Sequence, residues 1–165
     1  MPEAPMQANI DLIRRVLAAS NRQDPEAWAA FYSIDSTNHG RPVGRQGMRR
    51  VFGNLIQAFP DFHFEERQLV CSGDWVAAEL TMSGTHRGTP ELPVLGGLLT
   101  GVAPTGRHVS VENMHFYRIA DGLIADHRAV RDDLGLMQQL GLLPSNPNDA
   151  SRARPSRLSG KAMSP

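Results

Sequence analysis

The chain has 165 residues, enough for one domain with a sizeable hydrophobic core. Its 17 Lys and Arg residues balance 17 Asp and Glu residues, which argues against a nucleic acid or an anionic membrane as partner. The single cysteine excludes an intrachain disulfide and a cysteine-rich metal site. Because no apolar run reaches the length of a signal peptide or a membrane-spanning helix, we expect a soluble, cytoplasmic protein.

Helices are predicted in the N-terminal third. Apolar residues at helical spacing indicate a first helix over residues 7–20 and a third over 47–59. Between them, Asp24 and Pro25 have the residue types of an N-cap and a first helical position, so a second helix is predicted over 25–32. Trp28 on this helix either packs in the core or lines a cavity.

Residues 33–44 are polar and contain glycine and proline, so they are predicted to form an ordered loop. Within it, Asn38 and His39 can both donate and accept hydrogen bonds. They belong either to a solvated turn or to a pocket.

The pattern then changes to alternating polar and apolar residues. It predicts strands from Phe62 to about Val70 and from Trp75 to Thr85. The glycine- and proline-rich segment 84–107 follows, with His86 at its base, where a loop hydrogen-bonding role is favoured over catalysis. Because this connection is long and apolar, we interpret it as a lid over a cavity mouth or a dimer-contact arm.

A hairpin and a closing helix end the predicted domain. Strands are expected over 109–119 and from Leu123 to about Asp132, joined at Asp121-Gly122, with a helix over 133–141. An uninterrupted register places His115 near Arg128 and beside His127. Each histidine is either a satisfied structural residue or part of a site.

This order of elements predicts an α+β fold in which N-terminal helices cover one face of a curved antiparallel sheet. Such a half-cone leaves an apolar cavity suited to a small molecule. We expect one domain over residues 1–143 and a disordered tail over 144–165, where aromatic residues are absent and Ser, Pro and Asn are frequent.

Several local motifs, in this order, resemble the SnoaL-like polyketide cyclases of the nuclear-transport-factor-2-like superfamily. They are W28AAFY32 with Asn38-His39, Phe59-Pro60-Asp61, S83GTHRG88, A103PTGR107, H115FYRIADGLIADH127 and D132DLGLMQQLG141. The resemblance implies a cone-shaped barrel, also called cystatin-like, that is dimeric or of higher order. It further implies a cofactor-free aldol ring closure of a polyketide ester.

By position, Asp132 resembles the general acid/base of the family, and His115 and His127 would orient it or bind carbonyl oxygens. Trp28, Asn38, His39, Asn113 and His86 complete the expected substrate-binding set. A base and donors for the enolate oxygen suffice for this chemistry, so no metal or cofactor is expected. Arg128 stands where the family often has Trp, and it faces either the pocket or solvent.

Three functional hypotheses remain open because one fold can host many functions. The first is a cyclase or a related isomerase or hydratase. The second is a non-catalytic module that holds an apolar ligand in the same cavity. The third is an oligomerisation or delivery module, which would expose an apolar sheet face instead of a closed pocket.

Overall fold

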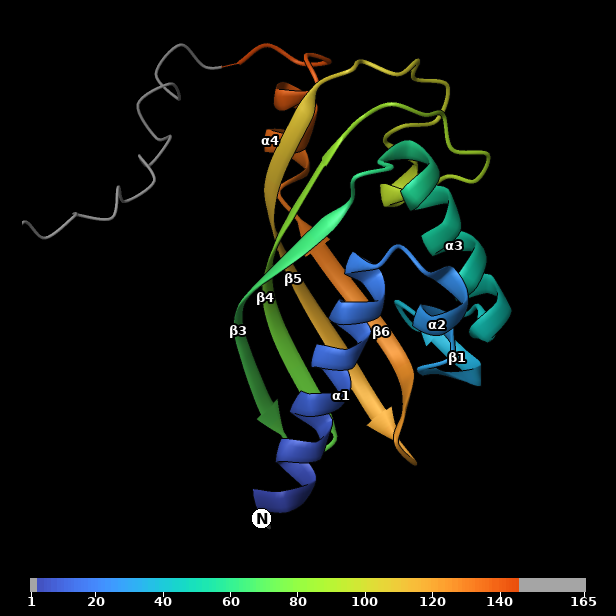
Figure 1. Cartoon of the computed structure of the whole chain (residues 1–165), viewed down its shortest axis with the longest axis vertical. Coiled ribbons are helices and arrows are strands. Elements are labelled where there is room, and N and C mark those ends of the chain that lie inside the picture. Colours follow the sequence, from blue (N-terminus) through green and yellow to red (C-terminus); the bar gives the residue numbers. More distant parts are fainter. Residues whose placement is uncertain (1–2, 146–165) are drawn as a thin grey trace, which may run out of the picture.

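The computed structural model describes residues 3–145, so all but the first two residues of the predicted tail lie outside the described part of the chain. A curved sheet carries helices on its inner side, with the core between them (Figure 1). The helices are α1 (Glu3–Asn21), α2 (Pro25–Ala29), α3 (Gly44–Ala58), the short η1 (Leu95–Gly97) and α4 (Asp133–Gln139).

The six strands form one open sheet in the order β2-β1-β6-β5-β4-β3. Only the β1–β6 pair is parallel, and the other neighbours are antiparallel. The α+β expectation is confirmed, with this parallel pair as the departure from an all-antiparallel sheet. The strands are β1 (Tyr32–Asn38), β2 (Arg41–Pro42), β3 (His63–Ser72), β4 (Trp75–Thr85), β5 (His108–Ala120) and β6 (Leu123–Arg131).

The start of α2 follows the predicted capping pattern. Asp24 accepts a hydrogen bond from the Ala27 amide at 3.0 Å, and Pro25 occupies the first turn. The helix nevertheless ends at Ala29, so the prediction that it extends to residue 32 is wrong. Tyr32 instead begins β1, which pairs with a strand from the far end of the chain.

The prediction of a loop over residues 33–44 is also wrong. Most of this stretch forms β1 and β2, which are joined by a two-residue turn at His39-Gly40. Both turn residues have positive φ angles, the conformation that tight hairpins require. Local composition indicates a loop, but the ladder hydrogen bonds supplied by β6 override it.

A bulge in the β5–β6 hairpin sets the direction of its side chains. Next to the turn, Ala120 pairs with Leu123, but the register shifts between Arg118 and Ile119. Beyond the shift, His115 pairs with Ala129 and not with Arg128 as predicted. Because side chains alternate across a strand, a one-residue shift moves each β6 side chain to the other face.

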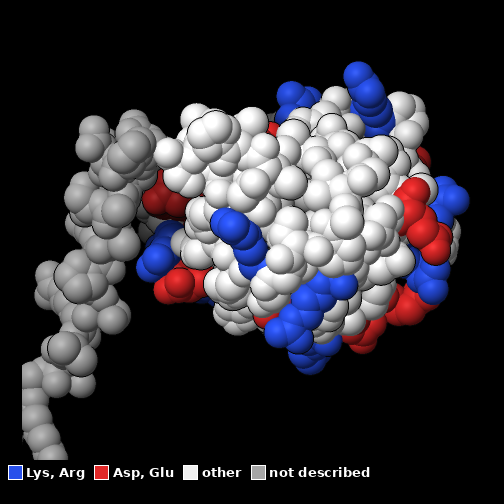
Figure 2. All heavy atoms as spheres, turned by 90° about the horizontal axis from the view of Figure 1, so that it is seen from above, with Lys and Arg blue, Asp and Glu red and all other residues white. Residues whose placement is uncertain are grey.

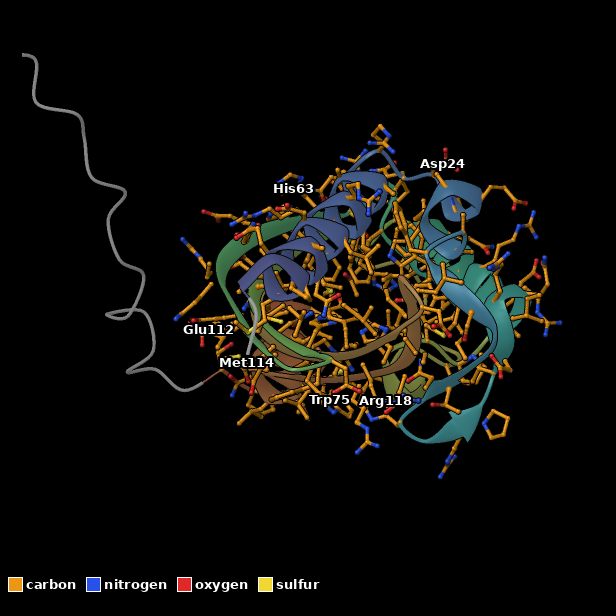
Figure 3. All side chains as sticks on the ribbon, turned by 90° about the horizontal axis from the view of Figure 1, so that it is seen from below. Asp24, His63, Trp75, Glu112, Met114 and Arg118 are labelled. Carbon is orange, nitrogen blue, oxygen red and sulfur yellow. The ribbon has the colours of Figure 1, made fainter. Side chains whose placement is uncertain are left out.

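The two faces of the sheet differ in what they carry. Inward-facing β5 side chains such as Val111 and Tyr117 are buried beneath the helices. Trp75 and Arg118 project on the side away from the helices (Figure 3). Met114 and Phe116 are exposed large apolar residues, and they alternate with the inward set on β5.

Candidate functional site

A cavity of about 300 Å³ lies between the sheet and helices α2 and α3. Residues 93–96 of the long β4–β5 segment line it, which favours the lid interpretation of that segment. The lining is mostly apolar with a few polar groups, the usual composition of a small-molecule site. It consists of Trp28, Asn38, His39, Met48, Val51, Phe52, Leu55, Phe64, Pro93, Val94, Leu95, Gly96, His115, Tyr117, His127, Ala129 and Arg131.

The end of the molecule that carries this segment shows mainly uncharged surface at its centre, with charged side chains around it (Figure 2). Val94 and Leu99 are buried and attach the segment to the body of the protein. The Asn54 side chain on α3 also holds it, because its Oδ1 accepts hydrogen bonds from the Glu91 and Leu92 amides at 2.7 and 2.9 Å.

Two histidines and two tyrosines form a buried polar chain along the cavity. Tyr32 Oη lies 3.0 Å from His127 Nδ1, and His127 Nε2 lies 2.8 Å from His115 Nδ1. Tyr117 Oη lies 3.2 Å from the same His115 nitrogen. The rings of His115, Tyr117 and His127 are stacked on one another, which restricts their rotation.

The bulge in the hairpin brings the two histidines onto the same face. Without the register shift, His127 would share the outward face of Phe116, whereas it pairs with Tyr117. The structure therefore brings His115 and His127 together as predicted, although by a register that was not predicted. The Nε2 atom of His115 is buried and has no hydrogen-bond partner among the described residues.

Both imidazoles are held neutral at ordinary pH. Burial lowers the pKa of His127 to about 3, and the nearby His39 contributes to this shift. Burial, then His127 and Arg131, hold the pKa of His115 well below its usual range. A neutral imidazole carries one N–H donor and one acceptor nitrogen. The hydrogen-bond partners of each ring therefore decide which of its two nitrogens is the donor and which is the acceptor.

The cation on the cavity wall is Arg131, three residues beyond Arg128, the position considered from the sequence. Its side chain is 14% exposed, and Nε donates to Asp133 Oδ1 at 2.9 Å. Arg128 instead faces outward, where it pairs with the buried Asp126 at 2.7 Å and lies over the Trp75 ring. The open question about Arg128 is thereby answered in favour of the outer face.

Asp132 is exposed and follows β6 directly, but it is not part of the cavity lining. It is the N-cap of α4, where Oδ1 accepts a hydrogen bond from the Gly135 amide at 2.8 Å. This bond leaves Oδ2 as a further acceptor. The acid/base role of Asp132 stays a prediction, and the structure adds a capping role.

The remaining predicted contacts divide into two groups. Trp28, Asn38 and His39 line the cavity. Asn113 and His86 do not; each is buried and has one polar side-chain atom without a partner among residues 3–145. His86 Nδ1 accepts a hydrogen bond from the Thr105 amide, consistent with the loop role favoured from the sequence.

Sequence reasoning missed Tyr32, Tyr117 and Arg131. Tyr32 was placed at a helix end, and nothing local indicates a contact with a residue 95 positions away. Tyr117 shares a strand face with His115, which is a signal that alternation alone could have supplied. The inward direction of Arg131 can be predicted only when the bulge in the hairpin is known.

Within the described residues, no group of three or more His, Cys, Asp or Glu side chains is arranged to hold a metal ion. None of the helices over residues 3–145 is long and apolar enough to cross a membrane.

Comparison with known proteins identifies the family. The family model for SnoaL-like polyketide cyclases matches residues 10–140, so the chain belongs to this family. Two similar relatives are aklanonic acid methyl ester cyclases. DnrD of Streptomyces peucetius is 35% identical and AcmA of Streptomyces galilaeus 40% identical, each over 82% of this chain and 92% of the relative. The crystal structure of AclR, a candidate hydroxylase from S. galilaeus, is 29% identical, covers 90% of both chains and has a TM-score of 0.73.

Proposed function

We propose that the protein closes a ring in a polyketide ester by a cofactor-free intramolecular aldol reaction. The observation that carries this proposal is the buried His115 Nε2 on the cavity wall, which has no hydrogen-bond partner within residues 3–145, with Arg131 on the same wall. Two relatives at 35–40% identity are named as cyclases of a polyketide methyl ester, which supports the same substrate class.

The chemistry needs a base for the proton next to a carbonyl and positive groups for the enolate oxygen. Asp132 Oδ2 is the proposed base, and the same carboxyl returns the proton to the new alkoxide, so the reaction is a net isomerisation. His115 and Arg131 are proposed to bind the enolate oxygen, because a preformed donor in a buried site stabilises charge more than it would in water.

Trp28, Asn38 and His39 are proposed to contact the substrate, since they line the cavity. His127 is proposed to act through His115, to which it is hydrogen-bonded. Asn113 and His86 stay predictions that the cavity lining does not support.

The test is incubation of purified protein with aklanonic or nogalonic acid methyl ester, followed by chromatography and mass spectrometry. Ring closure gives a new compound of unchanged mass, whereas a hydroxylase would add an oxygen atom. Asp132→Asn is expected to lose turnover. Asp24→Asn is the matched control because Asp24 is also an N-cap aspartate, at the start of α2, and has no proposed role in the reaction.

The alternative of a non-catalytic binding module predicts a different outcome. The ester would raise the unfolding temperature of the wild type, since a ligand that binds only the folded state stabilises it, yet no product would form. If the wild type and Asp132→Asn both turn over the ester, Asp132 has no part in the mechanism, but the cyclase assignment stands.

We further propose a homodimer formed through the outer face of the sheet, in a cytoplasmic protein. A shallow groove of about 220 Å³ on this face is lined in part by Val70, Ala77, Met114 and Phe116. Val70, Met114 and Phe116 are large exposed apolar residues, as a dimer contact would require. Light scattering would show a dimer for the wild type and a monomer for Phe116→Glu; a monomeric wild type would exclude the dimer.

A further inference from the structure

The hydroxyl groups of Tyr32 and Tyr117 both contact the histidine pair, and the proposed reaction leaves them without a role. Both side chains are among the largest fully or nearly fully buried ones, with exposed fractions of 0% and 2%. Each hydroxyl has a histidine nitrogen as its hydrogen-bond partner: His127 Nδ1 for Tyr32 and His115 Nδ1 for Tyr117. A buried O–H group needs an acceptor, so these contacts restrict where the imidazole hydrogens can be.

Two arrangements place a single hydrogen between the two imidazoles. In the first, His115 Nδ1–H donates to His127 Nε2, and His127 Nδ1–H donates to the Tyr32 oxygen. Both tyrosine oxygens are then acceptors in these contacts, and neither phenolic hydrogen has an acceptor among the described residues. This arrangement leaves two buried donors unpaired.

In the second arrangement, the Tyr32 hydroxyl donates to His127 Nδ1, and His127 Nε2–H donates to His115 Nδ1. The Tyr117 hydroxyl donates to the same His115 nitrogen over its longer distance of 3.2 Å, as the weaker arm of a three-centre bond that shares the one lone pair of Nδ1. Both phenolic hydrogens now have an acceptor. The hydrogen of His115 is then on Nε2, the atom that has no hydrogen-bond partner among the described residues.

We propose that Tyr32 and Tyr117 are positioning residues whose hydroxyls together hold His115 in the Nε2–H form, so that it presents a hydrogen-bond donor to an oxygen in the cavity. Their effect on catalysis rests on the cyclase function proposed above. The assignment of the hydrogen does not, because it follows from contacts within the protein.

The electrostatics of the site favour a hydrogen-bond donor role for His115 and disfavour a proton relay through the two histidines. Burial holds the pKa of His115 well below its usual range, which makes this imidazole a poor base but leaves its neutral N–H group intact. Burial also raises the pKa of Tyr32 well above its usual range, so Tyr32 keeps its proton. Arg131 is the nearby cation that acts on His115, and it opposes an imidazolium there.

The test is a long-range ¹H–¹⁵N correlation spectrum of the labelled, ligand-free protein, with the His115 signals assigned by comparison with His115→Gln. The wild type is expected to show hydrogen on Nε2 of both His115 and His127. Tyr32→Phe should shift the Nδ1 resonance of His127, and Tyr117→Phe that of His115, because each loses a donor. The double variant should add a population with hydrogen on His115 Nδ1.

Hydrogen on Nδ1 of His115 in the wild type overturns the proposal, whether or not any variant folds. Unchanged Nδ1 resonances in both single variants overturn it as well, since neither hydroxyl would then be a donor. With the ester substrate, the double variant should lose about tenfold or more in kcat with a smaller change in KM. If the wild type turns over no ester, the cyclase function fails while the spectrum still decides the tautomer.

Discussion

Tyr117 on β5 lies directly opposite His127 on β6, one residue out of step with the register that begins at the Asp121-Gly122 turn. This pairing gives His127 the inward direction that it shares with His115. It also directs Arg128 outward and Arg131 toward the cavity. A single bulge therefore decides which polar side chains the cavity contains, consistent with the frequent occurrence of bulges beside functional sites.

The capping role of Asp132 can be separated from its proposed catalytic role. Asp132→Asn keeps an acceptor for the Gly135 amide, so its free energy of unfolding should change by only a few tenths of a kcal/mol. Asp132→Ala removes the cap and should cost about 1 kcal/mol. Urea denaturation measures both, and an Asp132→Ala protein as stable as the wild type would show that the cap contributes nothing.

Gly135 provides the space that the Asp132 carboxylate occupies. A Cβ atom built on Gly135 would overlap Asp132 Oδ2, so Gly135→Ala must displace the cap and should be about 1 kcal/mol less favourable than the same change elsewhere in a helix. Gly53→Ala on α3 is the matched control, because a Cβ there has no neighbour within 4 Å. It should gain up to about 1 kcal/mol in thermal or urea unfolding. A stabilised Gly135→Ala protein would contradict the contact.

Stability should fall as the pH is lowered from 6.5 toward 3. The unfolded chain takes up protons at its histidines near pH 6.5, whereas folded His127 does so only at about 3, and the pKa of His115 is likewise lowered. His127 should cost about 1.4 kcal/mol per pH unit in this window, and His115 acts in the same direction. The lowered pKa values of Asp61 and Asp126 act in the same direction, but below about pH 4.

Urea unfolding between pH 7 and 4.5 measures this slope. His127→Gln should reduce it, whereas His63→Gln, a change at an exposed histidine, should leave it as in the wild type. A wild-type stability that is flat across this range would mean that the imidazole pair takes up protons in the folded state.

Asn54 should control the opening of the segment over the cavity. Asn54→Ala loses the acceptor for the Glu91 and Leu92 amides, at about 1 kcal/mol for each bond. Hydrogen exchange at these two amides should therefore become roughly 5- to 30-fold faster. Asn54→Asp keeps an acceptor oxygen and should exchange at close to the wild-type rate. Unchanged exchange in Asn54→Ala would show that other contacts hold the segment.

The sequence predicts those parts of the fold that local patterns determine. Asp24-Pro25 marks the start of α2, alternation gives β4 from Trp75 to Thr85, and Asp121-Gly122 marks the hairpin turn. β1 was missed because its polar residues and flanking glycines indicate a loop, and its partner strand is far away in the sequence. Within the site, His115 and His127 were predicted to lie together. The bulge leaves no local signal in the sequence, so Arg128 was considered for the pocket in place of Arg131.

The parallel pairing of β1 with β6 has a consequence for protein synthesis. The first strand to leave the ribosome has its long partner in the last strand to be made, and the Tyr32–His127 contact spans 95 residues. Contacts between such distant segments form slowly, because a long loop must close before they contribute. A nascent chain that stops short of β6 can form the β3–β4 and β4–β5 pairs, but it lacks the His127, Ala129 and Arg131 part of the cavity lining. It also leaves the Tyr32 hydroxyl without its histidine.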